Sequence, residues 1–133
     1  MDFFPLLCYN LIMSTTNKTS RPYKEMTTDT LIARRQELLD RMPDPAHVMR
    51  GSLITRSIKC GKPNCRCANG EGHRSLYLSS YYNGKTQLDS VPKIHMETVA
   101  QCMKDYDDIT ATLAEISCIN LELFRRRETD TLA

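Results

Sequence analysis

Cys60-Gly-Lys-Pro-Asn-Cys65-Arg-Cys67-Ala-Asn-Gly-Glu-Gly-His73 is the stretch around which the fold of this chain is organised. It contains three of the six cysteines of the chain and one of its three histidines. Three thiolates and an imidazole form a standard ligand set for structural zinc. Glycine, proline and asparagine favour a chain that turns back on itself, and the stretch has almost nothing that could build a core. The sequence therefore predicts a zinc-knuckle-like loop with one structural Zn²⁺, held by Cys60, Cys65, Cys67 and His73.

The cysteine spacing leaves other interpretations open. Cys65 and Cys67 form a Cys-x-Cys pair, which is less usual in zinc sites than pairs two to four residues apart. The alternatives are three reduced thiols beside an unrelated histidine, a disulfide that leaves one thiol unpaired, and a catalytic zinc with water in place of His73. Clustered thiol ligands favour a reducing compartment, so we expect the cytoplasm.

Segments with the composition of β-strands flank the loop. Residues 52–58 lead into it, residues 75–82 follow it, and residues 85–91 come after Asn83-Gly84. Asn-Gly between two such runs strongly favours a two-residue hairpin turn. This turn sets a register with the pairs Tyr81–Thr86 and Ser79–Leu88. We expect a three-stranded antiparallel sheet whose first two strands are joined by the metal loop.

Two helices complete the predicted fold. Thr27 or Thr28 caps the first, which carries an apolar stripe and ends before Pro43. Pro92 opens the second, which runs to Arg127. The fold class is α+β, with an N-terminal helix, the three-stranded sheet and a long C-terminal helix. We expect one domain over residues 27–127, between a disordered tail at 1–26 and a short tail at 128–133.

The C-terminal helix carries a heptad pattern. Its apolar positions alternate three and four residues apart from Val99 to Leu123, whereas Glu115 lies off this seam. The first helix spans about 21 Å and the second about 54 Å at 1.5 Å per residue, so part of the seam needs another partner. We expect this part to form a coiled coil with a second copy or a helical protein. Its predicted residues are Leu113, Ile116, Asn120 and Leu123.

Charge is distributed unevenly along a chain of ordinary composition. The 133 residues are 41% hydrophobic and 26% charged, with a formal net charge of +2. Residues 50–85 carry seven basic residues and one glutamate, a local charge of +6, so the remainder sums to −4. A basic segment with nearby tyrosines is typical of nucleic-acid binding. The candidate contacts are Arg56, Lys59, Lys62, Arg66 and Arg74.

The first residues are apolar but short. No apolar run approaches the roughly 20 residues of a membrane span, and residues 1–13 lack the basic start and small-residue cleavage site of a signal peptide. We expect translation to begin at Met13, with residues 1–12 being upstream sequence read in frame. The rival interpretation is a short membrane-surface anchor.

The core motif resembles that of a known family. Lys59-Cys-Gly-Lys-x-x-Cys65-x-Cys67, together with Gly51, Gly72-His73 and Val91-Pro-Lys93, resembles small bacterial and archaeal proteins catalogued as a domain of unknown function. The similarity covers roughly residues 50–125. The resemblance implies no settled activity, but it implies a setting beside mobile elements and transposase-like genes.

Two functions follow from these patterns. The first is a small non-enzymatic zinc module that binds DNA or RNA through its basic loop. The alternative is a self-assembly or protein-interaction module built on the C-terminal helix, with the zinc purely structural. The sequence shows no phosphate-binding glycine motif and no catalytic triad context, so we expect neither an enzyme nor a small-molecule substrate.

Overall fold

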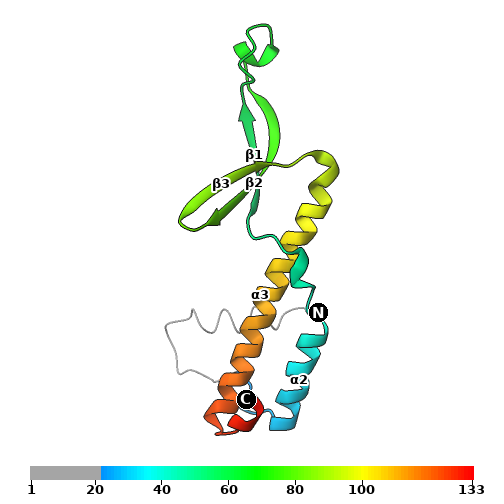
Figure 1. Cartoon of the computed structure of the whole chain (residues 1–133), viewed down its shortest axis with the longest axis vertical. Coiled ribbons are helices and arrows are strands. Elements are labelled where there is room, and N and C mark those ends of the chain that lie inside the picture. Colours follow the sequence, from blue (N-terminus) through cyan, green and yellow to red (C-terminus); the bar gives the residue numbers. More distant parts are fainter. Residues whose placement is uncertain (1–21) are drawn as a thin grey trace. The chain divides into compact units, whose positions relative to one another are not determined.

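The structure is a computed structural model that describes residues 22–133. Its elements are α2 (Thr28–Asp40), β1 (Ser52–Ile58), β2 (His73–Tyr82), β3 (Lys85–Ser90) and α3 (Met96–Arg125) (Figure 1). Short 3-10 turns lie between or after them. The predicted α+β class is confirmed. The predictions for the translation start, the membrane anchor and most of the N-terminal tail lie outside the described residues.

The chain divides into two compact units. Unit 2 is Pro45–Tyr106, which contains the sheet, and unit 1 combines the chain up to Asp44 with Asp107–Ala133. Helix α3 therefore contributes its first residues to unit 2 and the remainder to unit 1. Neither helix among residues 22–133 carries an apolar stretch able to cross a bilayer.

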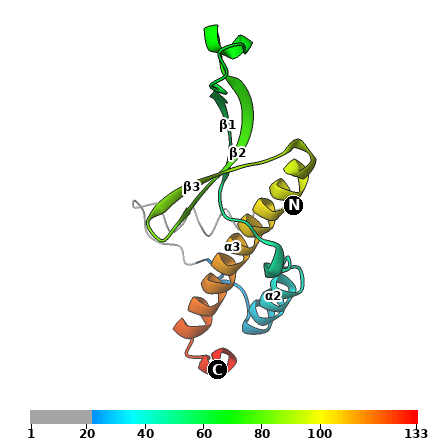
Figure 2. The ribbon, with the colours of Figure 1, turned by 45° about the horizontal axis from the view of Figure 1, so that its top comes forward.

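Unit 2 is built on an antiparallel sheet with the order β1-β2-β3. The predicted register is confirmed, because Tyr81 pairs with Thr86 and Ser79 with Leu88. Asn83 and Gly84 have φ values of 49° and 77°, the left-handed conformation that a two-residue hairpin turn requires. Figure 2 shows the cysteine-containing loop and this hairpin turn at opposite ends of β2. The metal loop therefore lies at the end of β2 that is remote from the Asn83-Gly84 turn.

The sheet is only partly covered. No residue of the three strands is fully buried, residues 75–80 of β2 are half-buried, and every residue of β3 is exposed. A small sheet normally gains its stability by burying one apolar face. This sheet gains less from such burial, and the metal loop at its end could supply further stability.

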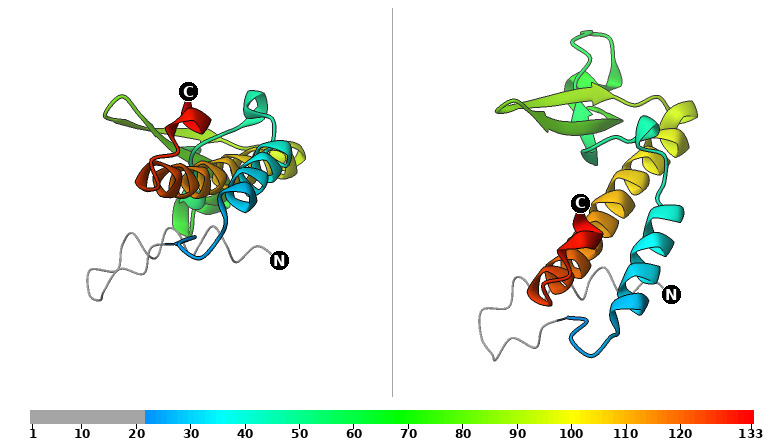
Figure 3. Two further views of the ribbon diagram at one scale, coloured as in Figure 1. Left: turned by 90° about the horizontal axis from the view of Figure 1, so that it is seen from below. Right: turned by 60° about the horizontal axis from the view of Figure 1, so that its bottom comes forward.

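Unit 1 is an antiparallel pair of helices. The side chain of Thr27 accepts a hydrogen bond from the backbone N–H of Thr30 at 3.2 Å and so caps α2. Helix α2 lies beside the C-terminal half of α3 (Figure 3). Their facing side chains form one apolar core of Leu31, Leu38, Ile119 and Leu123. This core is what fixes α2 on α3.

Two glutamates are buried at this helix interface. Glu115 is 0% exposed, and its Oε1 accepts hydrogen bonds from the hydroxyl of Tyr23 at 2.8 Å and from Nε of Arg34 at 2.9 Å. Nη2 of Arg34 donates to Oε2 at 3.3 Å. Glu122 is paired with Nε of Arg126 at 3.1 Å. The heptad pattern put Glu115 off the packed seam, but the side chain is buried, and a buried carboxylate is tolerated when it is paired.

The predicted self-association seam is used within the chain. Leu123 is fully buried in the core, and Ile116 packs against it. Oδ1 of Asn120 accepts a hydrogen bond from Nη1 of Arg35 at 2.8 Å. Of the four seam residues, only Leu113 is exposed. Helix α2 therefore packs along the part of α3 that was expected to remain uncovered, and Ile116, Asn120 and Leu123 have contacts within the chain.

Residues on both sides of the predicted domain are also structured. Residues 22–26 form a turn in which the N–H of Met26 donates to the carbonyl of Tyr23 at 3.0 Å. At the other end, Thr129–Leu132 form a 3-10 turn, and the N–H of Glu128 donates to the carbonyl of Leu123 at 3.0 Å. The hydroxyl of Thr28 donates to Oε1 of Glu128 at 2.8 Å. These segments belong to unit 1.

Candidate metal centre

The loop between β1 and β2 is closed by strand pairing. Ile58 is the last residue of β1 and pairs with His73, the first residue of β2. The chain leaves β1 through Gly61, whose φ is +78°. The N–H of Cys65 then donates to the carbonyl of Lys62 at 3.2 Å, and Arg66–Asn69 form a 3-10 turn. These turns bring the imidazole of His73 back beside Cys60, the first cysteine of the loop.

The four predicted ligands lie together. One donor atom from each of Cys60, Cys65, Cys67 and His73 lies within 4.8 Å of the other three. The Sγ atoms of Cys60 and Cys67 are 3.4 Å apart, and Sγ of Cys65 is 3.2 Å from Nε2 of His73. Zinc–sulfur bonds of about 2.3 Å place tetrahedral sulfur ligands about 3.8 Å apart. The cluster is therefore of the size that could hold one tetrahedral metal ion, with donor atoms moving by up to about 1 Å.

The backbone around the cluster favours thiolates. The N–H of Lys62, followed by the thiol of Cys67, lowers the pKa of Cys60. The N–H of Cys67, followed by its thiol, lowers the pKa of Cys65. The N–H of Cys60 acts to lower the pKa of Cys67, but burial and the neighbouring thiols raise it overall. Thiolates are the form that binds metal. Neighbouring thiolates repel one another, and a bound cation would offset this repulsion.

The donor set matches a structural site rather than a catalytic one. Three cysteines and one histidine occupy all four positions of a tetrahedral ion, whereas catalytic zinc keeps one position for water or substrate. Cys67 is buried, Cys65 is partly buried, and Cys60 and His73 are exposed. Cys102 and Cys118 are free thiols of α3 and are not members of this group. The cluster could hold a metal ion, and it is the sole such group found among residues 22–133.

Gly72 has a role that the sequence did not reveal. A Cβ atom at this position would lie 2.5 Å from the backbone carbon of Ile58 and 2.7 Å from its nitrogen. The glycine therefore lets β2 begin directly against the end of β1. Composition alone indicated a flexible turn here, whereas the requirement is for close approach between two backbones.

We expect Gly72→Ala to weaken metal binding. The new methyl group must push His73 and Ile58 apart, and overpacking of this kind costs about 1–3 kcal/mol. Zinc affinity, measured by competition with a chromophoric chelator, should fall about tenfold or more. Gly70→Ala is the matched control, because its Cβ would approach no atom closer than the carbonyl oxygen of Arg66 at 3.7 Å. Equal affinities for the two variants would contradict this role.

The five basic candidates surround the loop. Lys59, Lys62 and Arg66 lie on the loop itself, Arg56 on β1 and Arg74 on β2, and all five are exposed. Arg56 pairs with Ser75 and Arg74 with Ser57, so the two arginines project from opposite faces of the sheet. None of the five has an ion pair with a residue in the range 22–133.

The tyrosines are farther from the loop than a single patch would require. Tyr81 lies eight residues beyond His73 along β2, which is about 27 Å at 3.4 Å per residue. It is exposed near the hairpin turn, as is Tyr82. Tyr77 and Tyr81 share the sheet face of Arg56, because side chains alternate along a strand. The structure therefore provides one long face rather than a compact basic and aromatic cluster.

A known protein family matches the part of the chain that contains these elements. The model of a family described as a domain of unknown function (DUF6788) matches residues 28–101. The chain belongs to this family. The matched region contains α2, the sheet, the metal loop and the start of α3. No curated protein and no solved structure matches the chain.

Proposed function

We propose that this DUF6788 protein is a small non-enzymatic module, stabilised by zinc, that binds nucleic acid. The observation that carries the proposal is the set of exposed basic side chains around a loop that a metal ion would make rigid. Lys59, Lys62 and Arg66 lie within the metal loop, so zinc would fix their positions relative to one another. Fixed cations bind phosphates with a smaller loss of side-chain freedom than mobile ones.

The open sheet extends this surface. Arg56, Tyr77 and Tyr81 lie on one face, along which none of the strand residues is buried. A positively charged groove or face with aromatic side chains can follow a backbone and stack bases. Because the contacts are with phosphates and ring faces, we propose binding with little sequence preference.

The zinc would contribute structure rather than chemistry. With three thiolates and one imidazole, no position remains on the ion for water or substrate, which supports a role without catalysis. Thiolate ligands persist in a reducing environment, so we propose the cytoplasm as the site of action. A setting beside mobile elements and transposases would provide DNA, which makes DNA the first nucleic acid to test.

We expect the double variant Lys62→Ala, Arg66→Ala to lose nucleic-acid affinity without unfolding. Each phosphate contact removed should reduce the slope of log affinity against log salt by about one, so the double variant should lose about two. Fluorescence anisotropy with labelled single-stranded DNA, duplex DNA and RNA over a salt series measures both quantities. Lys93→Ala, Lys104→Ala is the matched control, since it removes the same charge away from the loop.

Absence of binding to all three nucleic acids at low salt would overturn this proposal. Equal losses in the two double variants would mean that only net charge matters, and would remove the role of the metal loop. Zinc content, measured on the same samples, shows whether the loop variant still holds its metal.

A further inference from the structure

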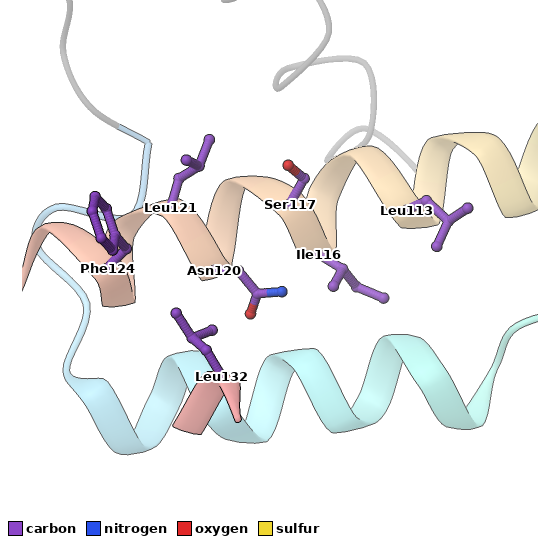
Figure 4. A pocket seen from close by; sticks show the side chains of 7 residues that line it. All are labelled: Leu113, Ile116, Ser117, Asn120, Leu121, Phe124 and Leu132. Carbon is purple, nitrogen blue, oxygen red and sulfur yellow. The ribbon is translucent and has the colours of Figure 1, made fainter. Parts of the chain in front are cut away.

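Helix α3 carries an apolar stripe on the side that α2 does not cover. Leu113, Ser117, Leu121 and Phe124 are spaced four, four and three residues apart, so they share one side of the helix. The three large side chains are 54%, 47% and 48% exposed, respectively. Figure 4 shows Leu121 and Phe124 pointing away from α2, whereas Ile116 and Asn120 point toward it. We call these four residues the outer stripe.

The outer stripe borders a shallow groove within unit 1. Ile116, Asn120 and Leu132, the last from the C-terminal 3-10 turn, complete the lining (Figure 4). The groove has a volume of about 430 Å³. A contiguous apolar patch on a small protein typically marks an interaction surface. The core of unit 1 does not use this patch, because its buried residues lie on the opposite side of α3.

We propose that a second copy of this chain docks antiparallel on the outer stripe. The stripe is self-complementary about Ser117, whose small side chain allows two helices to approach closely. Leu113 lies four residues before Ser117 and Leu121 four residues after it. In an antiparallel pair with its two-fold axis at Ser117, Leu113 of each copy therefore meets Leu121 of the other. Two-fold interfaces of this kind use the same surface on both copies.

Charge selects the antiparallel orientation. Asp107 and Arg125 are eighteen residues apart, which is five helical turns, so their exposed side chains lie on the same flank of α3. Asp107 lies ten residues before Ser117 and Arg125 eight residues after it. The antiparallel pair therefore places Asp107 of one copy close to Arg125 of the other at each end, whereas a parallel pair would place like charges together.

The contact is small for a permanent dimer. Residues 107–125 span about 27 Å, which is one helix–helix contact rather than the larger area of an obligate interface. We therefore expect reversible association at micromolar concentrations. This interface lies in unit 1 and does not depend on the nucleic-acid proposal, which concerns the metal loop of unit 2.

Sedimentation equilibrium of the full chain tests the proposal. Wild-type protein should be mainly dimeric at tens of micromolar, and Leu121→Glu should weaken association at least about tenfold. Ile94→Glu is the matched control, because Ile94 is 83% exposed and lies outside the stripe. Its association should equal that of wild type. Circular dichroism during thermal unfolding shows that the variants remain folded.

Charge reversal tests the orientation. Asp107→Arg and Arg125→Asp should each weaken the dimer, and the double variant should restore it, because each end then holds an opposite pair again. A wild-type monomer at tens of micromolar, or a dimer that Leu121→Glu leaves intact, would overturn the proposal. Failure of the double variant to recover association would overturn the antiparallel arrangement.

Discussion

Cys65→Ser is expected to unfold the three-stranded sheet of unit 2 while the helix pair of unit 1 stays folded. Structural zinc contributes about 10–16 kcal/mol of apparent binding free energy in small zinc-finger peptides, and this energy is folding energy. The sheet has no buried strand residue with which to replace it. Unit 1 has its own apolar core of Leu31, Leu38, Ile119 and Leu123.

Nuclear magnetic resonance of uniformly ¹⁵N-labelled protein provides the measurement. Amide resonances of residues 52–90 should lose their dispersion in Cys65→Ser, and those of the helix pair should keep theirs. A strong chelator added to wild-type protein should have the same effect, and added zinc should reverse it. Cys102→Ser is the control, because this thiol is not part of the metal cluster. A dispersed, cooperatively melting sheet in metal-free Cys65→Ser would refute a stabilising zinc.

Arg34→Ala should destabilise unit 1 by about 3 kcal/mol, because removing one partner of a buried ion pair leaves an uncompensated charge. The carboxylate of Glu115 would remain buried, with the hydroxyl of Tyr23 still donating to its Oε1 at 2.8 Å. Arg41→Ala is the matched control. Arg41 pairs with the partly exposed Glu37 at 3.0 Å, and such surface pairs contribute less than about 1 kcal/mol.

Urea unfolding followed by far-ultraviolet circular dichroism would measure the loss of stability in Arg34→Ala and in Arg41→Ala. The double variant Arg34→Met, Glu115→Met should recover much of the lost stability, because replacing both partners of a buried pair by apolar residues is often neutral. If the double variant were as unstable as Arg34→Ala, packing rather than buried charge would explain the loss. If Arg34→Ala and Arg41→Ala lowered the free energy of unfolding equally, burial of the Arg34–Glu115 pair would make no difference to stability.

Features that depend on local sequence could be predicted. Asn83-Gly84 alone determines the turn and hence the register between β2 and β3. The four candidate ligands are close in sequence, and their residue types match one metal chemistry. The closing pair of Ile58 and His73 could not be predicted, since it depends on pairing between β1 and β2.

The packing of the helices was less predictable. A three–four alternation selected Ile116, Asn120 and Leu123, but the structure buries Ile119 completely and gives Asn120 a polar partner. Glu115 was expected to lie off the seam, but the structure buries it together with Glu122. The partner of Glu115 is Arg34 from α2, and such a pair across a tertiary interface leaves no periodic signal in one segment. Glu122 instead pairs with Arg126, four residues along the chain.

The short sheet has a consequence for aggregation. Two of its three strands, β1 and β3, are edges with backbone groups that could join a strand of another molecule. Arg56 on β1 and Lys85 and Asp89 on β3 place charges along these edges. Charged side chains on edge strands disfavour amyloid-like addition of further strands. Replacing Arg56 by an apolar residue would therefore favour fibre formation, independently of the contact with phosphate that we propose for this side chain.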